Sequence, residues 1–480
     1  MGFENKLPNI VIFVPDSMRG DAISLDRKVN PIIETPNLDA LAREGTAFTN
    51  CFSTNPVCTP SRCCTFTGQY IHSCSHRSLY QMLQPHEENL FKFLKNKGYE
   101  VIMIGRNDLF NKDALKESVT RRIKAKVKAL KDNPFPKEHY LRKSFYYGLR
   151  NEDEAKDFDY SVIKAALKYL DSEPKEPFCL YIALNFPHPP YNVEEPYFSM
   201  YDREKIPNPI PKKLDDKPEF MQIMHERYGL YKLSKEDFKE IKATYYGMIS
   251  RVDHQFGQIV DKVKEIGKYE NTAFFFFSDH GDFTGDYGLI EKWPNAFHDC
   301  LLKVPLIMKI PGIHPINSVF TQLVQTIDIF PTILEIANIG TKYTHFGKSL
   351  IPLMKGNVKN IREAVFAEGG YDTREPQCFE DQIKSPDLPF IGIYYDKTNI
   401  PKEKPSTVAR SVMIRTKSWK LVLRSNNEDE LYDLMYDPIE INNLINIHGY
   451  EKIKINLKEQ LLRWYLKTSD NPDWRRIRLI

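Results

Sequence analysis

Apolar runs of strand length alternate with helical segments up to about residue 340. A run of this length is typical of a strand that is buried on both faces of a sheet. The alternation predicts an α/β fold in which helices sandwich a large, mostly parallel central sheet. The runs cover residues 9–14, 101–104, 178–184, 272–277 and 304–310, and helices are predicted at 35–42, 87–97, 157–170, 236–266 and 326–337.

The pattern changes after Gly356. Apolar and polar positions then alternate, as they do in half-exposed antiparallel strands. We therefore predict two domains: a large α/β domain over residues 1–356 and a smaller α+β subdomain with an antiparallel sheet over residues 357–480. The predicted strands of the subdomain are 362–368, 411–415, 419–423 and 430–434, and its closing helix is 450–466.

Two stretches of the first domain lack a clear core pattern. Residues 110–155 are charged and aromatic, and residues 192–235 are rich in proline. We interpret the first stretch as an insertion that shapes a cleft and the second as irregular. The lysine-rich residues 124–131 are expected to form a solvated helix face rather than a nucleic-acid site.

The composition is that of an ordinary globular protein, with 41% hydrophobic and 27% charged residues. A net charge of +3 does not by itself favour nucleic acid or a membrane surface. No stretch approaches the roughly 18 apolar residues of a membrane span. The eight cysteines form neither a disulfide framework nor a Cys-x-x-Cys pair, and residues 1–8 lack the features of a signal peptide. These features predict a cytoplasmic protein.

Polar side chains follow four of the predicted strands. In an open α/β sheet, ligands bind at the carboxyl ends of the strands, so these side chains are expected to meet at one edge. Asp16 and Asp279 offer oxygens to a hard divalent cation, and His280 adds a nitrogen. Taken singly, Asp16 is equally suited to cap a helix and residues 279–281 to form a turn. The strand-end groups are Asp16, Arg106 to Asp108, His188, and Asp279 with His280.

A short motif at positions 57–68 combines cysteine, proline, serine and arginine in an unusual way. Pro60 fixes the direction in which the chain leaves its loop. Ser61 is suited to cap a helix that would aim N–H groups at Cys58 and at a neighbouring anion. Arg62 adds a forked cation of the kind that binds phosphate or sulfate. An isolated cysteine is most often a buried structural residue, but this motif predicts an anion site around Cys58.

The motif Cys-x-Pro-Ser-Arg at 58–62, followed by Thr-Gly at 67–68, resembles the signature of the sulfatase family in the alkaline phosphatase superfamily. The resemblance spans residues 9 to about 444. It implies an alkaline phosphatase-like fold and oxidation of Cys58 to formylglycine, whose hydrated aldehyde is the nucleophile. It also implies a formylglycine-generating maturation enzyme as a partner.

The resemblance implies roles for individual side chains. Lys292, twelve residues after His280, would contact the sulfate and the nucleophile, and His188 would protonate the leaving oxygen. Without the family pattern, Lys292 is an ordinary surface lysine and His188 a loop histidine. The implied catalytic residues are Cys58, Arg62, His188 and Lys292, the metal ligands are Asp16, Cys58, Asp279 and His280, and the substrate contacts are Arg106, Asn107 and His76.

Two positions depart from the family pattern. Ser17 stands where the family has a second aspartate, so fewer carboxylates balance the metal. Calcium is the preferred metal, with manganese and magnesium as alternatives. Asp108 stands where many members have a histidine, and it cannot supply that cation. Residues 72–77 and 371–395 are expected to line the cleft.

The sequence hypothesis is a sulfuric ester hydrolase that acts on a small-molecule or saccharide sulfate ester, without nucleic acid or membrane partners. Phosphonate monoester or phosphodiester hydrolysis at the same site is the first alternative, which Ser17 keeps open. A non-catalytic binding protein with the same fold is the second, and it is disfavoured because the nucleophile, metal pair, lysine and histidine are all present.

Overall fold

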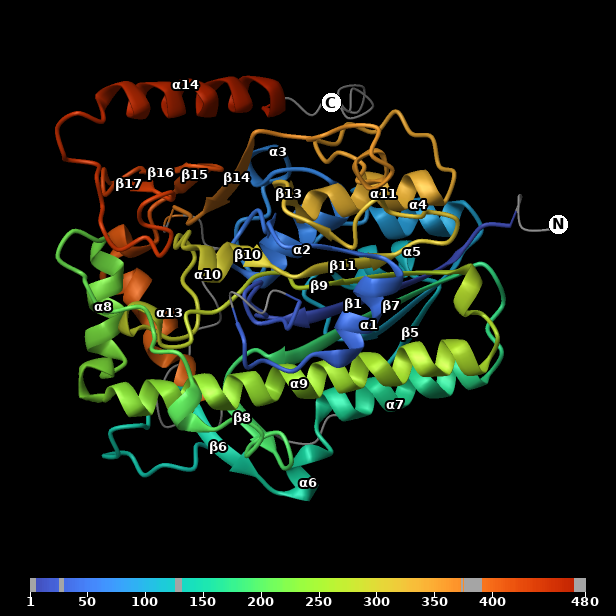
Figure 1. The fold of residues 1–480 in the computed structure, drawn as a ribbon, viewed down its shortest axis with the longest axis horizontal. Helices are drawn as coiled ribbons and strands as arrows, with labels where there is room; N and C mark the ends of the chain where they lie inside the picture. Colours follow the sequence, from blue (N-terminus) through green and yellow to red (C-terminus); the bar gives the residue numbers. More distant parts are fainter. Residues whose placement is uncertain (1–5, 26–29, 126–131, 373, 375–390, 470–480) are drawn as a thin grey trace.

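The predicted apolar runs lie side by side in one eight-stranded sheet of the computed structural model (Figure 1). The structure describes residues 6–25, 30–125, 132–372, 374 and 391–469. In spatial order the strands are β12 (Val319–Phe320), β2 (Thr46–Phe48), β11 (Leu306–Lys309), β9 (Thr272–Phe277), β1 (Asn9–Asp16), β7 (Phe178–Pro187), β4 (Glu100–Gly105) and β5 (Arg121–Ile123).

The centre of this sheet is parallel. Strand β1 pairs in parallel with both β9 and β7, and β4 continues the parallel order from β7 to β5. Strand β11 joins β9 in the antiparallel direction. The predicted mostly parallel sheet is therefore confirmed, and the carboxyl ends of β1, β4, β7 and β9 meet at one edge.

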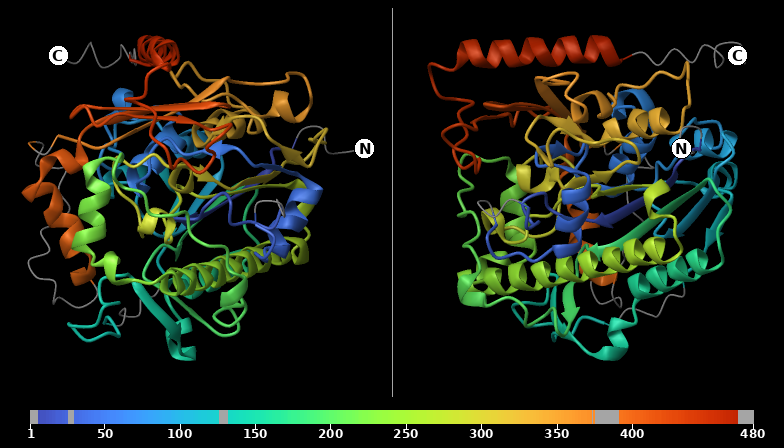
Figure 2. Two further views of the ribbon diagram at one scale, coloured as in Figure 1. Left: turned by 60° about the vertical axis from the view of Figure 1, so that its left-hand side comes forward. Right: turned by 45° about the vertical axis from the view of Figure 1, so that its right-hand side comes forward.

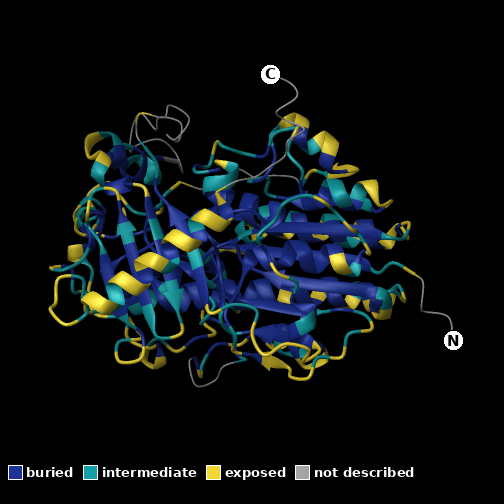
Figure 3. Ribbon diagram, turned by 90° about the horizontal axis from the view of Figure 1, so that it is seen from above, coloured by how far each residue is buried: buried dark blue, intermediate teal, exposed yellow. Residues whose placement is uncertain are grey.

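Strand β1 is buried on both faces because helices cover each side of the sheet (Figures 1 and 3). Val11 and Phe13 pack into one core cluster with residues of the long helix α9, whereas Ile10 and Ile12 face a second cluster. The first layer contains α1 (Pro36–Glu44), α7 (Phe158–Asp171) and α9 (Lys235–Glu265), and the second contains α2 (Cys58–Thr67), α4 (Leu90–Asn96) and α11 (Ile329–Ile336).

The C-terminal region forms the predicted antiparallel sheet, with one helix lying along it (Figures 1 and 3). Leu457, Leu461 and Trp464 of the helix pack onto Ile414 and Leu421 of the sheet. The boundary at residue 356 stays a prediction. The elements are β14 (Ala364–Gly369), β15 (Ser411–Thr416), β16 (Trp419–Arg424), β17 (Glu430–Asp433) and α14 (Glu451–Thr468).

The structure changes the interpretation of the two stretches in which the sequence shows no clear core pattern. Residues 110–155 contain α5 (Lys112–Ser118) and β5, which extends the edge of the main sheet. Because β5 has three residues and none of them is fully buried, its sequence carries no apolar run. Residues 192–235 contain α8 (Glu219–Arg227). Most of the predicted solvated helix face lies outside the described residues.

Shorter elements complete the description of the chain. Among the described residues, no helix has the length and apolar content that crossing a bilayer requires. The remaining elements are β3 (Cys51–Phe52), α3 (Ile71–Cys74), β6 (Tyr146–Arg150), α6 (Glu152–Ala155), β8 (Tyr191–Glu194), α10 (Asp299–Leu302), β10 (Lys303–Val304), β13 (Val324–Gln325), α12 (Ile351–Met354) and α13 (Tyr395–Glu403), with short 3₁₀ turns between them.

Candidate active site

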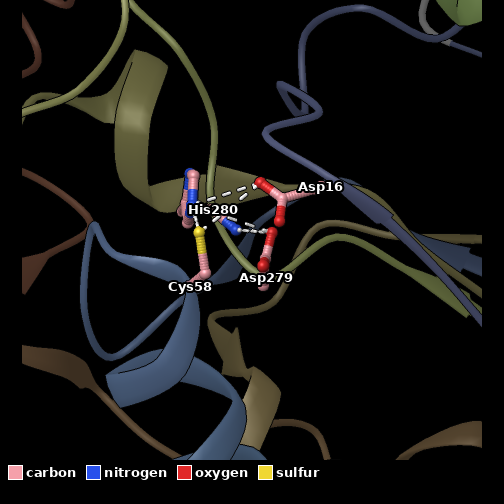
Figure 4. A group of neighbouring side chains, drawn as sticks. All are labelled: Asp16, Cys58, Asp279 and His280. Atoms are coloured by element: carbon pink, nitrogen blue, oxygen red, sulfur yellow. Dashed lines mark hydrogen bonds and ion pairs between the residues drawn. The ribbon is translucent and has the colours of Figure 1, made fainter. Parts of the chain in front are cut away.

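Four buried side chains converge at the carboxyl edge of the sheet (Figure 4). Asp16 ends β1, Asp279 and His280 follow β9, and Cys58 begins α2. The Sγ atom of Cys58 lies 3.2 Å from Nε2 of His280 and 3.6 Å from Oδ1 of Asp16. The same histidine nitrogen lies 3.6 Å from Asp16 and 3.9 Å from Asp279. The structure therefore brings together all four predicted metal ligands.

Cys58 is the first residue of α2, so it lies at the positive end of the helix dipole. The predicted capping role of Ser61 is wrong, because the helix begins three residues earlier, after an extended Val57. The N–H of Val57 donates to Oδ1 of Asn55 at 2.7 Å and fixes this entry. The Ser61 hydroxyl instead donates a hydrogen bond to the carbonyl oxygen of Asp279 at 2.6 Å. This bond connects α2 to the loop that carries Asp279 and His280.

The buried guanidinium of Arg62 lies against the carboxylates of Asp16 and Asp279. Its Nε donates to Oδ2 of Asp279 at 2.8 Å and its Nη2 to Oδ2 of Asp16 at 3.0 Å, and the guanidinium is fully buried. These two bonds show that Arg62 balances and orients the two aspartates. The predicted direct stabilisation of sulfuryl oxygens by Arg62 stays a prediction.

The donor set suits a divalent cation. Nδ1 of His280 donates to the carbonyl oxygen of Gly281 at 2.8 Å, which leaves the Nε2 lone pair facing the cluster. Burial lowers the pKa of His280, so the ring is neutral at neutral pH. Burial acts to raise the pKa of Asp16, but cations including Arg106 and Arg62 hold it well below its ordinary range. Two carboxylates and one neutral imidazole nitrogen thus fit a metal ion here.

Ser17 occupies the position where the family has a second aspartate. Its hydroxyl donates to Oδ1 of Asp16 at 3.0 Å, and its backbone N–H donates to Oδ1 of Asp279 at 3.2 Å. Its φ of 67° lies in the left-handed region, where the carbonyl oxygen accepts a 2.7 Å hydrogen bond from Tyr245. Ser17 therefore orients both carboxylates without adding charge.

Arg106 supplies a partly exposed cation beside this cluster. Its Nη1 donates to Oδ2 of Asp16 at 3.0 Å, its Nε pairs with Asp108, and 26% of its side chain is exposed. Gly105 allows this placement: it has φ of 109°, and a Cβ there would lie 2.0 Å from the carbonyl oxygen of Ala183. Asp108, which cannot replace a family histidine, instead holds the arginine in place.

His188 and Lys292 form a hydrogen-bonded pair. Nζ of Lys292 donates to Nε2 of His188 at 2.8 Å, and Nδ1 of His188 donates to the carbonyl oxygen of Pro189 at 2.7 Å. Burial and the Lys292 cation lower the pKa of His188 well below its ordinary value, so the ring is neutral and its Nε2 accepts a hydrogen bond from the lysine. Burial also acts to lower the pKa of Lys292, but neighbouring negative groups, the Glu291 and Asp16 carboxylates among them, outweigh it and raise that pKa.

The Cys58 thiol itself is a weak nucleophile. Burial, together with the Asp16 carboxylate, raises its pKa well above the ordinary cysteine value. It therefore stays protonated at neutral pH, whereas reactive cysteines are thiolates in electropositive surroundings. Chemistry at position 58 through the unmodified sulfur is disfavoured.

Two of the predicted substrate contacts have protein partners instead. The amide of Asn107 exchanges two hydrogen bonds with the backbone of Phe110, at 2.8 and 3.1 Å. Nδ1 of His76 contacts the carbonyl oxygen of Gln81 at 2.5 Å, and its Nε2 lies 3.2 Å from Glu87. Because these bonds use the polar atoms of both side chains, the structure disfavours the predicted contacts. Most of the predicted cleft segment 371–395 lies outside the described residues.

Sequence reasoning missed Glu291, Lys397 and the role of Tyr191. Glu291 is fully buried and accepts hydrogen bonds from Nζ of Lys292 at 2.8 Å and Nζ of Lys397 at 2.6 Å. The hydroxyl oxygen of Tyr191 accepts the backbone N–H of Glu291 at 3.0 Å. Adjacency to Lys292 was the one available signal for Glu291, and Lys397 carried none because it is distant in the sequence.

Comparison with known proteins gives the family. A family model described as Sulfatase matches residues 8–339, which is more than half of the chain. The chain belongs to the sulfatase family. A second model, described as N-sulphoglucosamine sulphohydrolase, C-terminal, matches residues 391–467 of this sulfatase. The predicted enzyme class, a sulfuric ester hydrolase, is confirmed by the family.

Relatives of this sulfatase align along nearly its whole length. Human arylsulfatase K is 24% identical over 97% of this chain and 88% of its own. The phosphonate monoester hydrolase of Agrobacterium radiobacter has a similar fold, with a TM-score of 0.74, 22% identity and 96% of each chain covered. A protein solved with its substrate D-glucosamine-2-N,6-O-disulfate has a TM-score of 0.74 at 19% identity, covering 97% of this sulfatase and 99% of that chain. These likenesses confirm the alkaline phosphatase-like fold.

Proposed function

We propose that this sulfatase hydrolyses sulfate monoesters of saccharides with a nucleophile derived from Cys58. The observation that carries the proposal is the convergence of Cys58 with two carboxylates and the Nε2 of His280, all within 4.8 Å of one another. A divalent cation held by Asp16, Asp279 and His280 would supply Lewis acidity at this position. Calcium is our preferred ion, with manganese and magnesium as alternatives.

Conversion of Cys58 to formylglycine supplies a hydrated aldehyde, whose hydroxyl is a nucleophile. The raised pKa of the thiol argues against the unmodified side chain as the nucleophile, because it stays protonated. The position at the N-terminus of α2 favours an anion beside residue 58. A formylglycine-generating enzyme is the partner that the proposal requires.

Lys292 and His188 deliver the proton to the leaving oxygen. In the free enzyme the proton lies on Lys292 and is directed at Nε2 of His188, at 2.8 Å. We propose that the pair acts as one general acid: Lys292 passes a proton to Nε2 of His188, the ring turns Nε2–H toward the leaving oxygen and gives that proton up, and Lys292 is left as the neutral amine. The Lys292 ammonium and the exposed part of Arg106 also stabilise negative charge on the sulfuryl oxygens.

The substrate class is supported by the relatives, one of which was solved with a sulfated glucosamine. Phosphonate monoester hydrolysis is the second candidate, favoured by Ser17 and by the similar fold of the Agrobacterium radiobacter enzyme. The two candidates share the same side chains. Their substrates also carry the same charge, since sulfate monoesters and phosphonate monoesters are both monoanions, so only rates on the two kinds of ester separate the candidates.

The test is a comparison of rates on sulfated mono- and disaccharides, an aryl sulfate, an aryl phosphonate monoester and a phosphodiester. We expect the highest kcat/KM on a sulfated saccharide, and a clear preference for the phosphonate would overturn the proposal. Mass spectrometry of the Cys58 peptide should show the change from thiol to aldehyde. Cys58→Ala should lose at least ~10³-fold in kcat, because it removes the nucleophile.

A further inference from the structure

Four side chains form a continuous chain of polar contacts that runs from the candidate general acid into the C-terminal region. Nζ of Lys292 donates to Nε2 of His188 at 2.8 Å and to Oε1 of Glu291 at 2.8 Å. The other carboxylate oxygen, Oε2 of Glu291, accepts from Nζ of Lys397 at 2.6 Å. One carboxylate is thus shared between two ammonium groups, and only one of them contacts His188.

The backbone of Glu291 is held in a strained conformation. Its φ is 60°, in the left-handed region that non-glycine residues seldom occupy. The hydroxyl of Tyr191 accepts its N–H at 3.0 Å and donates to Oδ1 of Asp282 at 2.7 Å, while the N–H of Lys292 donates to Oε2 of Glu291 at 2.7 Å. The surrounding structure therefore fixes this carboxylate in one place.

Lys397 reaches the carboxylate from helix α13, which is anchored to the larger domain. Asp396, the preceding residue, accepts from Nζ of Lys143 at 2.7 Å and from Nε of Arg227 at 3.2 Å. Arg227 ends α8, which lies beside α13 (Figure 2). Lys397 thus belongs to the segment that matches the second family model, whereas Glu291 and Lys292 belong to the first.

The charges explain what Lys397 does to Lys292. Oε1 of Glu291 also lies 3.7 Å from Nε2 of His188, so this carboxylate competes with the imidazole for the lysine protons. Lys397 neutralises the carboxylate at Oε2, so that only Oε1 faces the Lys292 ammonium. Without Lys397, the carboxylate would draw Lys292 toward itself and away from His188.

Stability alone is a poor explanation for this arrangement. The side chains of Glu291, Lys292 and Lys397 are 1%, 3% and 9% exposed, so all three are desolvated. A buried ion pair is often no more stabilising than an apolar pair of the same volume. Glu291, in contrast, directly contacts the His188–Lys292 pair, and this contact gives the cluster a role in the reaction.

We propose that Glu291 and Lys397 form a charge clamp that positions the Lys292 ammonium against Nε2 of His188. Lys397 is then a positioning residue that the C-terminal region contributes to the active site. The inference rests on the proposed function, in which the pair protonates the leaving oxygen. Loss of the clamp should therefore slow esters with poor leaving groups more than esters with good ones.

The experiment compares Lys397→Met with wild type on an alkyl or sugar sulfate and on a nitrophenyl sulfate. We expect kcat on the sugar sulfate to fall roughly tenfold or more, as part of the ~10²–10⁴-fold that general acid catalysis supplies, and kcat on the nitrophenyl ester to change much less. An unchanged kcat on both esters, or an equal fall on both, would overturn the inference. A wild-type enzyme inactive on both sulfates would instead overturn the proposed function.

Further variants test whether Lys397 acts through Glu291. If it does, Lys397→Met should cost much less in a Glu291→Gln background than in wild type, and additive losses would contradict the clamp. Lys397→Arg should restore part of the loss. Lys397→Gln, measured in parallel with thermal unfolding, keeps the test informative should the methionine variant fold poorly. Lys404→Met is the matched control, since Lys404 pairs with the exposed Glu219 and should leave both rates unchanged.

Discussion

Oε2 of Glu291 lies 2.6 Å from Nζ of Lys397, although 106 residues separate them in the sequence. The contact joins the loop that carries Lys292, the proposed proton source, to helix α13 of the C-terminal region. Under the proposed clamp, the C-terminal region thereby completes the charge balance of the candidate active site. The following predictions test this site in parts that can be varied independently.

Removal of the metal should inactivate the enzyme and lower its stability. Asp16, Asp279 and His280 are buried together, so a bound cation offsets the repulsion between the two carboxylates. At a free metal concentration of 100 times Kd, the ion should stabilise the folded state by about 2.7 kcal/mol. Activity and Tm should both fall after chelation and return with calcium. Asp279→Asn should show a much smaller rise in Tm on addition of calcium, and an equal rise would place the ion elsewhere.

Arg62→Met should destabilise the metal-free protein by about 3–5 kcal/mol, because it leaves two buried carboxylates without their shared cation. The loss should be smaller with metal bound, since the ion replaces part of the missing charge. Urea unfolding with and without calcium measures both values. Arg62→Lys retains the charge but not the forked geometry, so its loss should be intermediate. Equal losses in both metal states would contradict this account.

The pH dependence of kcat should be flat across the neutral range. The pKa of His188 is lowered from 6.5 and that of Lys292 is raised from 10.5. Between pH 6.5 and pH 10.5, therefore, the His188 ring is neutral and Lys292 is a protonated ammonium. His188 gains a second proton only as pH falls well below 6.5, and Lys292 loses its proton only as pH rises above 10.5. A pH–rate profile measures this. Glu291→Gln should move the alkaline limb to lower pH, and a wild-type limb at 6.5 would contradict the assignment.

Ser17→Asp should tighten metal binding, by roughly tenfold or more, because it adds a carboxylate beside Asp16 and Asp279. The φ of 67° at this position is one that aspartate and asparagine tolerate better than most residues. The measurement is the chelator concentration that halves activity. Ser17→Asn, which has the same conformational tolerance without the charge, is the control. If both variants bind metal equally, the added charge is not responsible.

The sequence predicted the parts of the fold that depend on local patterns. Strand β9 was predicted at its observed bounds, because six consecutive buried positions, four of them phenylalanine, are incompatible with an exposed element. Strand β5 was missed because an edge strand of three residues needs no apolar run. The start of α2 was misplaced because its N-cap is Val57, which makes no side-chain capping bond and so leaves no capping signal in the sequence.

The candidate metal ligands could be predicted for a similar reason. Asp16 and Asp279 follow apolar strands, and parallel strands bring their carboxyl ends to one edge. The motif at Cys58 added the nucleophile through its resemblance to the family. These residues are therefore determined by short stretches of sequence, each of which is informative by itself.

Tertiary structure alone decided how the charges are distributed among those residues. The sequence predicted Arg62 as an anion-binding cation, and only the fold shows it buried between Asp16 and Asp279, where it is a counter-ion for the candidate metal ligands. Likewise, no local pattern in the sequence predicts that Lys397 pairs with Glu291. Charge pairing depends on distance and desolvation in three dimensions, and residues far apart in sequence acquire both only when the chain has folded.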